Sequence, residues 1–222
     1  MIGLKDKKDG FSSVYKILTD QKIYKIYNQV AFSKYFRDKL SKFKRLYDEL
    51  YKIKLSVKHK VISKSIIQIE ELESDQKVTI KKLFNNERLL KDFLKQIKNI
   101  GNVKKNISSK KIIHEIENYT KNDSQHQKIN NKINELKKYI DVYIQNKICH
   151  GDLHLGNIFI NKNKFYFLDW DYYVLSSSGY DLAMFAYLEK LNKKQIEKIS
   201  LYSKVSLEEI YHYLPICQLL DY

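Results

Sequence analysis

The apolar positions of the first eighty residues change their spacing along the chain. Residues 12–27 contain two β-rich runs, SSVYKIL and KIYKIY, on either side of the polar residues TDQ, and this pattern predicts a hairpin. From Phe32 to Ile53, large apolar residues recur every three or four positions, which predicts an amphipathic helix. The runs VISKSIIQIEEL and KVTI within residues 61–80 predict further strands. An order of strand, strand, helix and strands is typical of a small α+β lobe.

The rest of the chain is patterned mainly for helices. Residues 81–146 contain no proline and a single glycine, and their apolar residues predict helices with a polar loop at residues 121–131. The runs NIFI and FYFL flank NKNK and predict a second hairpin at residues 157–168. After the run SSSG the chain is predicted to be helical to near its end. Asp181 is expected to be a helix N-cap, and Pro215 is expected to break the last helix.

The length and composition of the chain limit its class. Its 222 residues, 43% of them hydrophobic, suffice for one large domain or two small lobes around a buried core. The opening MIGLKDKKDG contains no apolar run of signal-peptide length, and no stretch approaches the roughly 18 uncharged residues of a membrane span. Cys149 and Cys217 show no metal-binding spacing. We therefore expect a globular cytoplasmic protein with no transmembrane segment and with two buried thiols.

The formal net charge of +15 is unevenly distributed. Residues 1–146 carry 33 Lys or Arg against 17 Asp or Glu, whereas residues 147–222 carry 8 against 9. Only three of the basic residues are Arg, although Arg is the preferred residue for bidentate recognition of phosphates and bases. We interpret the surplus of Lys as solvated surface charge and expect no nucleic-acid partner.

Residues 150–157 read HGDLHLGN, and FLDWDYY follows at residues 167–173. Three interpretations are open: a metal site of His and Asp, a kinase catalytic loop followed by a metal-binding acid, or an ordinary turn between buried strands. The five-residue offset from Asp152 to Asn157 equals that of the H-R-D-L-x-x-x-N loop of protein kinases. Such a loop holds a carboxylate against the attacking hydroxyl and presents an amide oxygen to magnesium on the ATP phosphates. Asp169, after the second strand of the hairpin, would supply another oxygen ligand of the kind that suits Mg²⁺.

Two other metal chemistries fit this motif less well. A zinc site would have to recruit Cys149, His150 and His154 from a single loop, and it would leave Asn157 and Asp169 without a role. A two-metal phosphatase needs several Asp, His and Asn ligands. The remaining histidines stand in helical or polar contexts without companion acids; they are His59, His114, His126 and His212. Both interpretations are therefore less favoured than the kinase loop.

The ordered elements HGDLHLGN, LDWD and DLA resemble the signature of the aminoglycoside phosphotransferase and choline kinase superfamily. That signature reads H-[GN]-D-L-H-x-x-N, a short hairpin, [IL]-D-[WF]-[DE] and D-[LI]-A. Protein kinases would show DFG at residues 169–171, where this chain has DWD. The resemblance implies an α+β, two-lobed, protein-kinase-like fold. Its small β-rich N-terminal lobe would span residues 1–75 and bind the nucleotide, and its mainly helical lobe would span residues 76–222 and carry the catalytic loop and the metal-binding hairpin.

The resemblance also implies two cofactors, ATP and Mg²⁺, and roles for individual residues of the C-terminal lobe. Asp152 would be the catalytic base, and Asn157 and Asp169 would bind Mg²⁺. Two residues would support the catalytic loop: His150 by organising its backbone, and Asp181 of DLA by bracing it.

A kinase of this kind also needs a phosphate-covering loop, a strand Lys, a helix acid that pairs with this Lys, and a hinge. Lys25 in KIYKIY is expected to be the strand Lys, with Lys22 as the alternative. Glu49 is expected to be the helix acid, with Asp48 and Asp38 as alternatives. The other expected nucleotide-binding residues are Gly10, Ser12 and Ser13 in the phosphate-covering loop and Glu71 and Leu72 in the hinge.

The acceptor is expected to be a small molecule with a hydroxyl group. Asp171 beside Trp170 and Tyr172 could hold a quaternary ammonium by a charge partner and cation–π attraction, which favours choline or ethanolamine. The form HGDLH is closer to the aminoglycoside branch, and the basic N-terminal two thirds could serve an anionic acceptor such as a surface-polysaccharide or lipopolysaccharide sugar. A catalytically degenerate, basic binding protein on the same scaffold is the alternative of another class.

Overall fold

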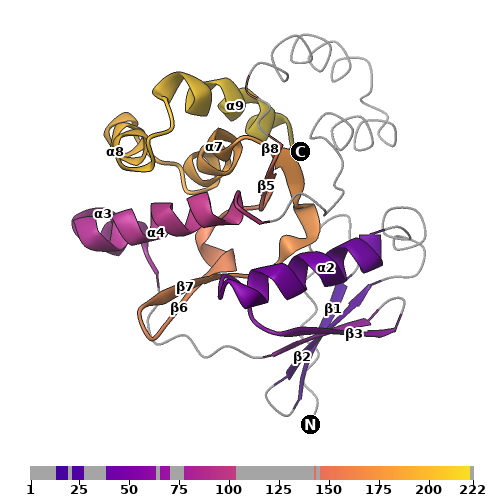
Figure 1. Cartoon of the computed structure of the whole chain (residues 1–222). Helices are drawn as coiled ribbons and strands as arrows, with labels where there is room; N and C mark the ends of the chain where they lie inside the picture. Colours follow the sequence, from indigo (N-terminus) through magenta and orange to yellow (C-terminus); the bar gives the residue numbers. More distant parts are fainter. Residues whose placement is uncertain are drawn as a thin grey trace.

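An antiparallel sheet and one long helix form the N-terminal part of the structure (Figure 1). The computed structural model describes residues 14–19, 22–27, 39–63, 66–70, 78–103, 143 and 146–220. The described elements of this part are β1 (Val14–Thr19), β2 (Lys22–Tyr27), α2 (Lys39–Lys52), β3 (His59–Ser63) and β4 (Ile66–Glu70). The strand order is β1-β2-β4-β3, so β2 is an inner strand that pairs with β1 on one side and β4 on the other.

The sequence pattern predicted most of this part. The β1–β2 hairpin and the strands β3 and β4 are confirmed, and the helix is confirmed over Lys39–Lys52. Residues 32–38, where the apolar pattern of the helix begins, lie outside the described residues. Leu46, Tyr47 and Leu50 are buried, as expected for the apolar stripe of an amphipathic helix. The Tyr47 ring stacks on His59 of β3 with 3.6 Å between ring centroids, which holds α2 against the sheet.

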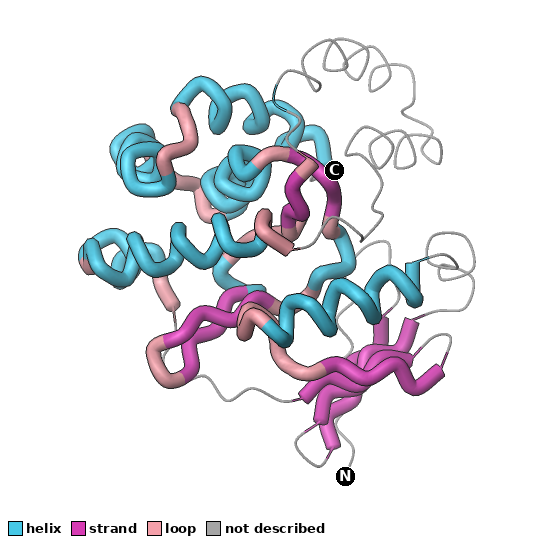
Figure 2. Tube along the Cα trace, in the orientation of Figure 1, coloured by secondary structure: helices cyan, strands magenta, loops and turns pink. Residues whose placement is uncertain are grey.

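Helices dominate the C-terminal part (Figure 2). Its described helices are α3 (Ile80–Asn85), α4 (Glu87–Ile100), α7 (Ser178–Leu188), α8 (Lys193–Ser203) and α9 (Leu207–Leu220). Two short strand pairs complete it: β5 (Lys147–Cys149) with β8 (Val174–Ser176), and β6 (Ile158–Asn161) with β7 (Lys164–Phe167). In Figure 1 the sheet and α2 lie in the lower part of the view, and the helices of the C-terminal part lie above them. The β6–β7 hairpin lies beside α2. Residues 104–142, including the polar loop expected at 121–131, are not described.

The β6–β7 hairpin is confirmed, and it joins the two parts. Its turn is made by Lys162 and Asn163, whose φ values of 48° and 59° suit the tight two-residue turns of hairpins. Phe165 and Phe167 of β7 are buried against Phe93 of α4, with ring centroids 5.4 and 6.3 Å apart. The backbone N–H of Phe167 also donates to the carbonyl oxygen of Leu55, just after α2, at 2.8 Å.

Three predictions of local structure were wrong. The run KVTI is not a strand: Thr79 caps α3, and its side-chain oxygen accepts a hydrogen bond from the backbone N–H of Lys82 at 3.2 Å. Asp181 lies inside the first turn of α7, whose N-cap position is occupied by Ser177. Pro215 lies inside α9, which continues to Leu220 because packing of a helix can outweigh the one backbone hydrogen bond that proline cannot donate.

Two expectations drawn from composition can be compared with the structure. Cys149 and Cys217 are buried free thiols, as predicted, and burial raises the pKa of both. Within the described part of the chain, no helix has the length and apolar character needed to cross a membrane.

Candidate active site

The catalytic loop predicted from HGDLHLGN connects β5 to β6 and ends in a 3-10 turn at Leu155–Asn157. Gly151 near its start has a φ of 82°, a left-handed backbone conformation that glycine adopts without strain. A Cβ atom at this position would lie 1.9 Å from the backbone oxygen of Tyr172, so the second residue of the motif has no room for a side chain. The loop is therefore packed closely against the segment that follows Asp169.

Asp181 holds the beginning of the catalytic loop. Its two carboxylate oxygens accept hydrogen bonds from the backbone N–H groups of His150, at 2.8 Å, and Gly151, at 3.0 Å. Burial raises the pKa of Asp181 to about 6, although the two N–H groups act in the opposite direction. The resemblance implied that the Asp of DLA braces the loop, and these two hydrogen bonds connect Asp181 to the first residues of the loop.

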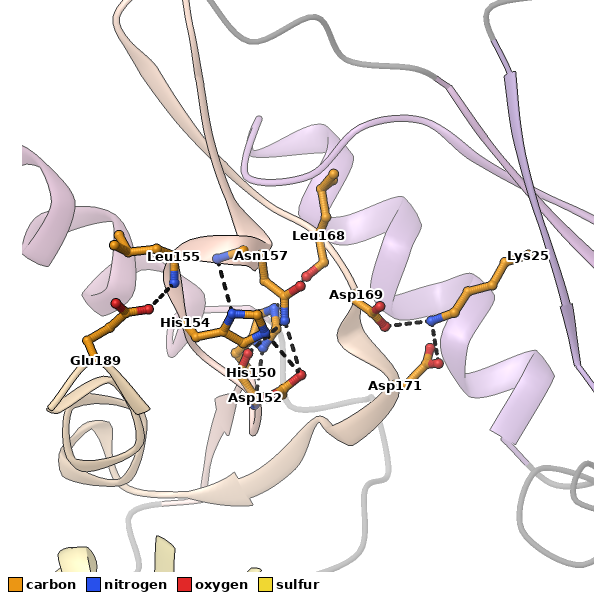
Figure 3. Close-up of polar contacts among 11 residues, drawn as sticks. Lys25, His150, Asp152, His154, Leu155, Asn157, Leu168, Asp169, Asp171 and Glu189 are labelled. Atoms are coloured by element: carbon orange, nitrogen blue, oxygen red, sulfur yellow. Dashed lines mark hydrogen bonds and ion pairs between the residues drawn. The ribbon is translucent and has the colours of Figure 1, made fainter. Parts of the chain in front are cut away.

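Glu189 holds the other end of the loop, and the sequence analysis missed it. It follows α7 directly, and its Oε1 accepts a hydrogen bond from the backbone N–H of Leu155 at 2.6 Å (Figure 3). The two residues are 34 positions apart, and no local pattern of the sequence connects them. A single helix thus positions the catalytic loop at both ends, through Asp181 in its first turn and Glu189 at its end.

His150 is fully buried and acts as a structural imidazole. Its Nε2 lies 2.8 Å from the carbonyl oxygen of Leu168, which can only accept, so Nε2 carries the proton and donates it. Its Nδ1 then accepts a hydrogen bond from the backbone N–H of Asp152 at 3.3 Å. The ring lies 4.5 Å from that of Trp170. Burial lowers the pKa of His150, which favours the neutral ring that these contacts require.

Cys149, His150 and His154 do not form the zinc site that was one interpretation of the sequence. Cys149 donates its thiol hydrogen to the carbonyl oxygen of Ser177 at 3.0 Å, and His150 is directed at Leu168. His154 accepts a hydrogen bond at Nδ1 from the backbone N–H of Gly156 at 3.0 Å. Among the residues that the structure describes, no group of three or more His, Cys, Asp or Glu side chains is arranged to hold a metal ion.

Asp152 and Asn157 come together across the loop (Figure 3). The Asn157 amide nitrogen donates to the backbone oxygen of Asp152 at 2.9 Å and to its Oδ2 at 3.1 Å. The Asp152 carboxylate is 32% exposed, so a molecule in solution can reach it. His154 places Nε2 3.7 Å from the same Oδ2, and this carboxylate is the main cause that raises the pKa of His154.

Asp169 follows β7 in a left-handed conformation, with a φ of 64°. Its Oδ1 lies 2.5 Å from the ammonium nitrogen of Lys25, which comes from β2 (Figure 3). The residue before it, Leu168, donates its backbone N–H to the backbone oxygen of Asn157 at 2.9 Å. The two expected metal ligands, Asn157 and Asp169, therefore belong to adjoining, hydrogen-bonded segments.

Lys25 also contacts Asp171, through the ammonium nitrogen and Oδ2, in a buried ion pair (Figure 3). Burial acts to lower the pKa of Lys25, but the charges of Asp171 and then Asp169 outweigh it and raise the pKa. Lys25 is consequently a protonated ammonium. The alternative strand lysine, Lys22, is exposed at the start of β2.

The other expected site residues divide into three groups. Glu49 forms an ion pair with Lys52 at 2.6 Å, and its pairing with Lys25 stays a prediction. Trp170 is fully buried and its Nε1 donates to the carbonyl oxygen of Phe167 at 2.8 Å, while Tyr172 ends the same 3-10 turn. The remaining residues, Gly10, Ser12, Ser13, Glu71 and Leu72, and also Asp38, lie outside the described residues.

The oxygen atoms at this site suit a magnesium ion bound together with a nucleotide. The Asn157 amide nitrogen is directed at Asp152, so the amide oxygen is the atom left for a cation, and Asp169 offers a carboxylate that is 25% exposed. Mg²⁺ commonly takes only one or two protein carboxylates and completes its shell with water and phosphate oxygens. Two protein ligands beside a nucleotide are therefore sufficient.

The sheet with its helix, the helical part and the loop between them define the fold class: an α+β, two-lobed, protein-kinase-like fold. Solved structures confirm it. The choline kinase LicA from Streptococcus pneumoniae has a TM-score of 0.78 at 18% identity, covering 100% of this chain and 84% of that one. A choline/ethanolamine kinase family protein from Mesorhizobium loti has a TM-score of 0.71 at 11% identity, covering 100% and 77%. APH(2″)-IIia, solved with GDP and kanamycin, has a TM-score of 0.62 at 12% identity, covering 99% and 85%.

Sequence comparison supports the same group of proteins. A family model described as the phosphotransferase enzyme family matches residues 110–197, which include the catalytic loop and the hairpin. A LicA homologue from Metamycoplasma hominis is 38% identical over 80 residues, which is 33% of this chain and 32% of that protein. The chain thus matches about a third of the length of this curated relative. The resemblance noted in the sequence motifs is confirmed.

Proposed function

We propose that this protein is a phosphotransferase that moves the γ-phosphoryl group of ATP to a hydroxyl group of a small molecule. The observation that carries the proposal is the convergence of four side chains from three separate segments. Asp152 and Asn157 come from the catalytic loop, Asp169 from the end of the hairpin, and Lys25 from the sheet. This set matches the parts that phosphoryl transfer requires: an acid for the acceptor, ligands for magnesium and a cation for the phosphates.

Each of these side chains has a role in the proposed reaction. The exposed carboxylate of Asp152 would orient the acceptor hydroxyl and accept its proton, and the Asn157 amide keeps this carboxylate in place. Asn157 and Asp169 would hold Mg²⁺, which, when bound, neutralises the charge on the phosphates. The Lys25 ammonium would contact the phosphates from the N-terminal side. Positioning of the two substrates supplies much of the rate in such a reaction.

The nucleotide-binding residues of the N-terminal lobe complete the proposal. Gly10, Ser12 and Ser13 would cover the phosphates, and the backbone at Glu71 and Leu72 would contact the adenine. The boundary between the two lobes is proposed near residue 75, between β4 and α3. A cytoplasmic location is part of the same proposal, because ATP is the phosphoryl donor.

Choline or ethanolamine is the proposed acceptor. This rests on the similarity to LicA, to a LicA homologue and to a choline/ethanolamine kinase family protein. The similarity to APH(2″)-IIia in complex with kanamycin supports a second candidate, an aminoglycoside or another sugar. The role expected for Asp171 and Trp170 in binding a quaternary ammonium gains no support, because both are buried and Asp171 contacts Lys25.

An ATP-consumption assay with purified protein and Mg²⁺ tests the proposal. The acceptors are choline, ethanolamine, aminoglycosides, amino sugars and lipopolysaccharide sugars, each measured also with Asp152→Ala. Turnover of one acceptor that is lost in Asp152→Ala would support the proposal and name the acceptor. Absence of turnover and of ATP binding would contradict it. The binding-protein alternative instead requires salt-sensitive binding to nucleic acid or anionic lipid that survives this substitution.

A further inference from the structure

We propose that Asp171, the second acid of DWD, is the residue that positions Lys25 for the nucleotide. The inference rests on the proposed function and deepens it, because it assigns to this acid a task within the nucleotide site instead of the acceptor site. Asp171 is a positioning residue: it acts on the reaction through the Lys25 ammonium.

Lys25 has a fixed place in the sheet. It lies on the inner strand β2, opposite Lys16 of β1 and Ile67 of β4, so its backbone is fixed on both sides. Its side chain leaves the sheet and reaches the segment after the β6–β7 hairpin (Figure 3). A lysine buried to this extent is costly unless carboxylates neutralise it. The segment after the hairpin supplies this neutralisation.

Asp171 lies in a short turn that is held firmly in place. Asp171 is the middle residue of the 3-10 turn Trp170–Tyr172. Trp170 anchors this turn, because it is fully buried, donates from Nε1 to the carbonyl oxygen of Phe167 and packs on His150. The turn is closed by a hydrogen bond from the Tyr173 N–H to the Trp170 carbonyl oxygen at 3.3 Å. The Asp171 carboxylate therefore has a fixed position.

The two acids that contact Lys25 differ in their exposure to solvent. The Asp169 side chain is 25% exposed, whereas the side chains of Asp171 and Lys25 are each 4% exposed. The accessible carboxylate is the one that a cation from solution can reach. When Asp169 binds a cation, its share in neutralising Lys25 falls, and the buried Asp171 keeps the ammonium paired and in place.

Protein kinases supply the acid partner of the strand Lys from a helix of the N-terminal lobe, and α2 is the described helix of that lobe in this protein. From residue 44 to the end of α2 at Lys52, the buried side chains are those of Leu46, Tyr47 and Leu50. Asp48 is exposed, and Glu49 is half-buried and contacts the exposed Lys52 at 2.6 Å; its pairing with Lys25 is the alternative that Glu49→Gln tests. An aromatic ring, that of Tyr47, occupies the buried face of the helix and lies on His59.

A double-mutant cycle on nucleotide affinity tests the inference without an acceptor. The dissociation constant of a fluorescent ATP analogue with Mg²⁺ is measured for the wild type, Asp171→Asn, Lys25→Met and the double variant. Glu87→Gln is the matched control, because it removes an acid from an exposed ion pair with Lys91 on α4. We expect each single substitution to weaken binding about tenfold and the double variant to be no weaker than Lys25→Met, since Asp171 acts through Lys25.

The cycle also guards against loss of folding. The double variant removes the two buried charges, those of Lys25 and Asp171, together and leaves only the partly exposed Asp169, so it is expected to remain folded even if Asp171→Asn does not. Asp171→Glu, which keeps the charge, is expected to recover part of the affinity. Thermal unfolding of every variant is followed in parallel by circular dichroism.

Three results would overturn the inference. If the fold-changes in dissociation constant of the two single variants multiply in the double variant, Asp171 acts independently of Lys25. Unchanged nucleotide affinity in Asp171→Asn would mean that Asp171 does not position Lys25 for the nucleotide. A larger, Lys25-dependent loss of affinity in Glu49→Gln would assign the task to α2. Absence of nucleotide binding by the wild type is distinguishable from all three, because it would refute the proposed function itself.

Discussion

Asp181 and Glu189 hold opposite ends of the catalytic loop from opposite ends of one helix. Asp181 accepts hydrogen bonds from the N–H groups of His150 and Gly151, and Glu189 accepts one from the N–H of Leu155. The proposed base, Asp152, lies between these anchors. The position of its carboxylate therefore depends on α7 as well as on the loop that contains it.

Replacement of Asp152 tests the proposed chemistry most directly. We expect Asp152→Asn to lower kcat by about a thousandfold or more, because the variant can no longer accept the acceptor proton. The carboxylate is partly exposed, and its side-chain contacts are the Asn157 amide and His154, which is also partly exposed, so the free energy of unfolding should change little. Steady-state kinetics and urea unfolding measure the two effects. Wild-type kcat in this variant would exclude Asp152 as the base.

Glu189 is expected to be a positioning residue. Glu189→Ala leaves the N–H of Leu155 without its carboxylate and should lower the free energy of unfolding by about 1 to 2 kcal/mol. The loop would also become less well placed, so kcat should fall while the KM for ATP stays close to the wild-type value. Glu197→Ala, at an exposed position of α8, is the matched control. Equal kinetics for the two variants would argue against a role for Glu189 in placing the loop.

Gly151 is expected to accept no side chain. Gly151→Ala combines a φ of 82° with a Cβ atom 1.9 Å from the oxygen of Tyr172, so the loop or the following segment must move. We expect a loss of about 3 kcal/mol or more in unfolding free energy, measured by chemical denaturation. Gly101→Ala is the control, because its Cβ would meet only the flexible side chain of Lys147, at 3.0 Å. Equal stability of the two variants would contradict the geometry of the loop.

The pKa of Asp181 predicts a pH dependence of stability. Its folded pKa of about 6 lies above the ordinary value of 3.8, so the folded state binds more protons between these two pH values. Asp181 therefore contributes less to the stability of the folded protein as pH rises from about 4 to about 6. Above pH 6 its contribution no longer changes with pH. The lowered pKa of His150 acts in the opposite direction, because protonation of this residue at low pH disfavours the folded state.

The comparison with Asp181→Asn isolates this effect, because His150 is present in both proteins. We expect the stability difference between wild type and variant, from urea unfolding at several pH values, to shrink by about 1 to 3 kcal/mol across the window. A difference that is constant with pH would mean that Asp181 keeps an ordinary pKa in the folded protein.

Local patterns predicted the elements whose residues are close in sequence. The β-rich runs KIYKIY and FYFL beside turn-forming residues predicted the hairpins. The helical spacing around Leu46 and Leu50 predicted α2, because a helix turns such a stripe of apolar residues toward the core. The same reasoning failed for KVTI, since a short apolar run does not distinguish a strand from the start of a helix, and Thr79 is a helix cap. It also missed β5 and β8, which pair across more than twenty residues.

The sequence by itself was sufficient to predict a chemistry for the site: the order and spacing of Asp152, Asn157 and Asp169 predicted a phosphoryl-transfer loop, and resemblance to a known family predicted the fold. Only the tertiary structure decided the partners. It directed Asp171 to Lys25 and Glu189 to Leu155, over separations of 146 and 34 residues. The physical reason is that spacing within a motif constrains residues on one segment. Pairing of a buried charge or of a buried N–H group depends on which distant segment the folded core brings to it.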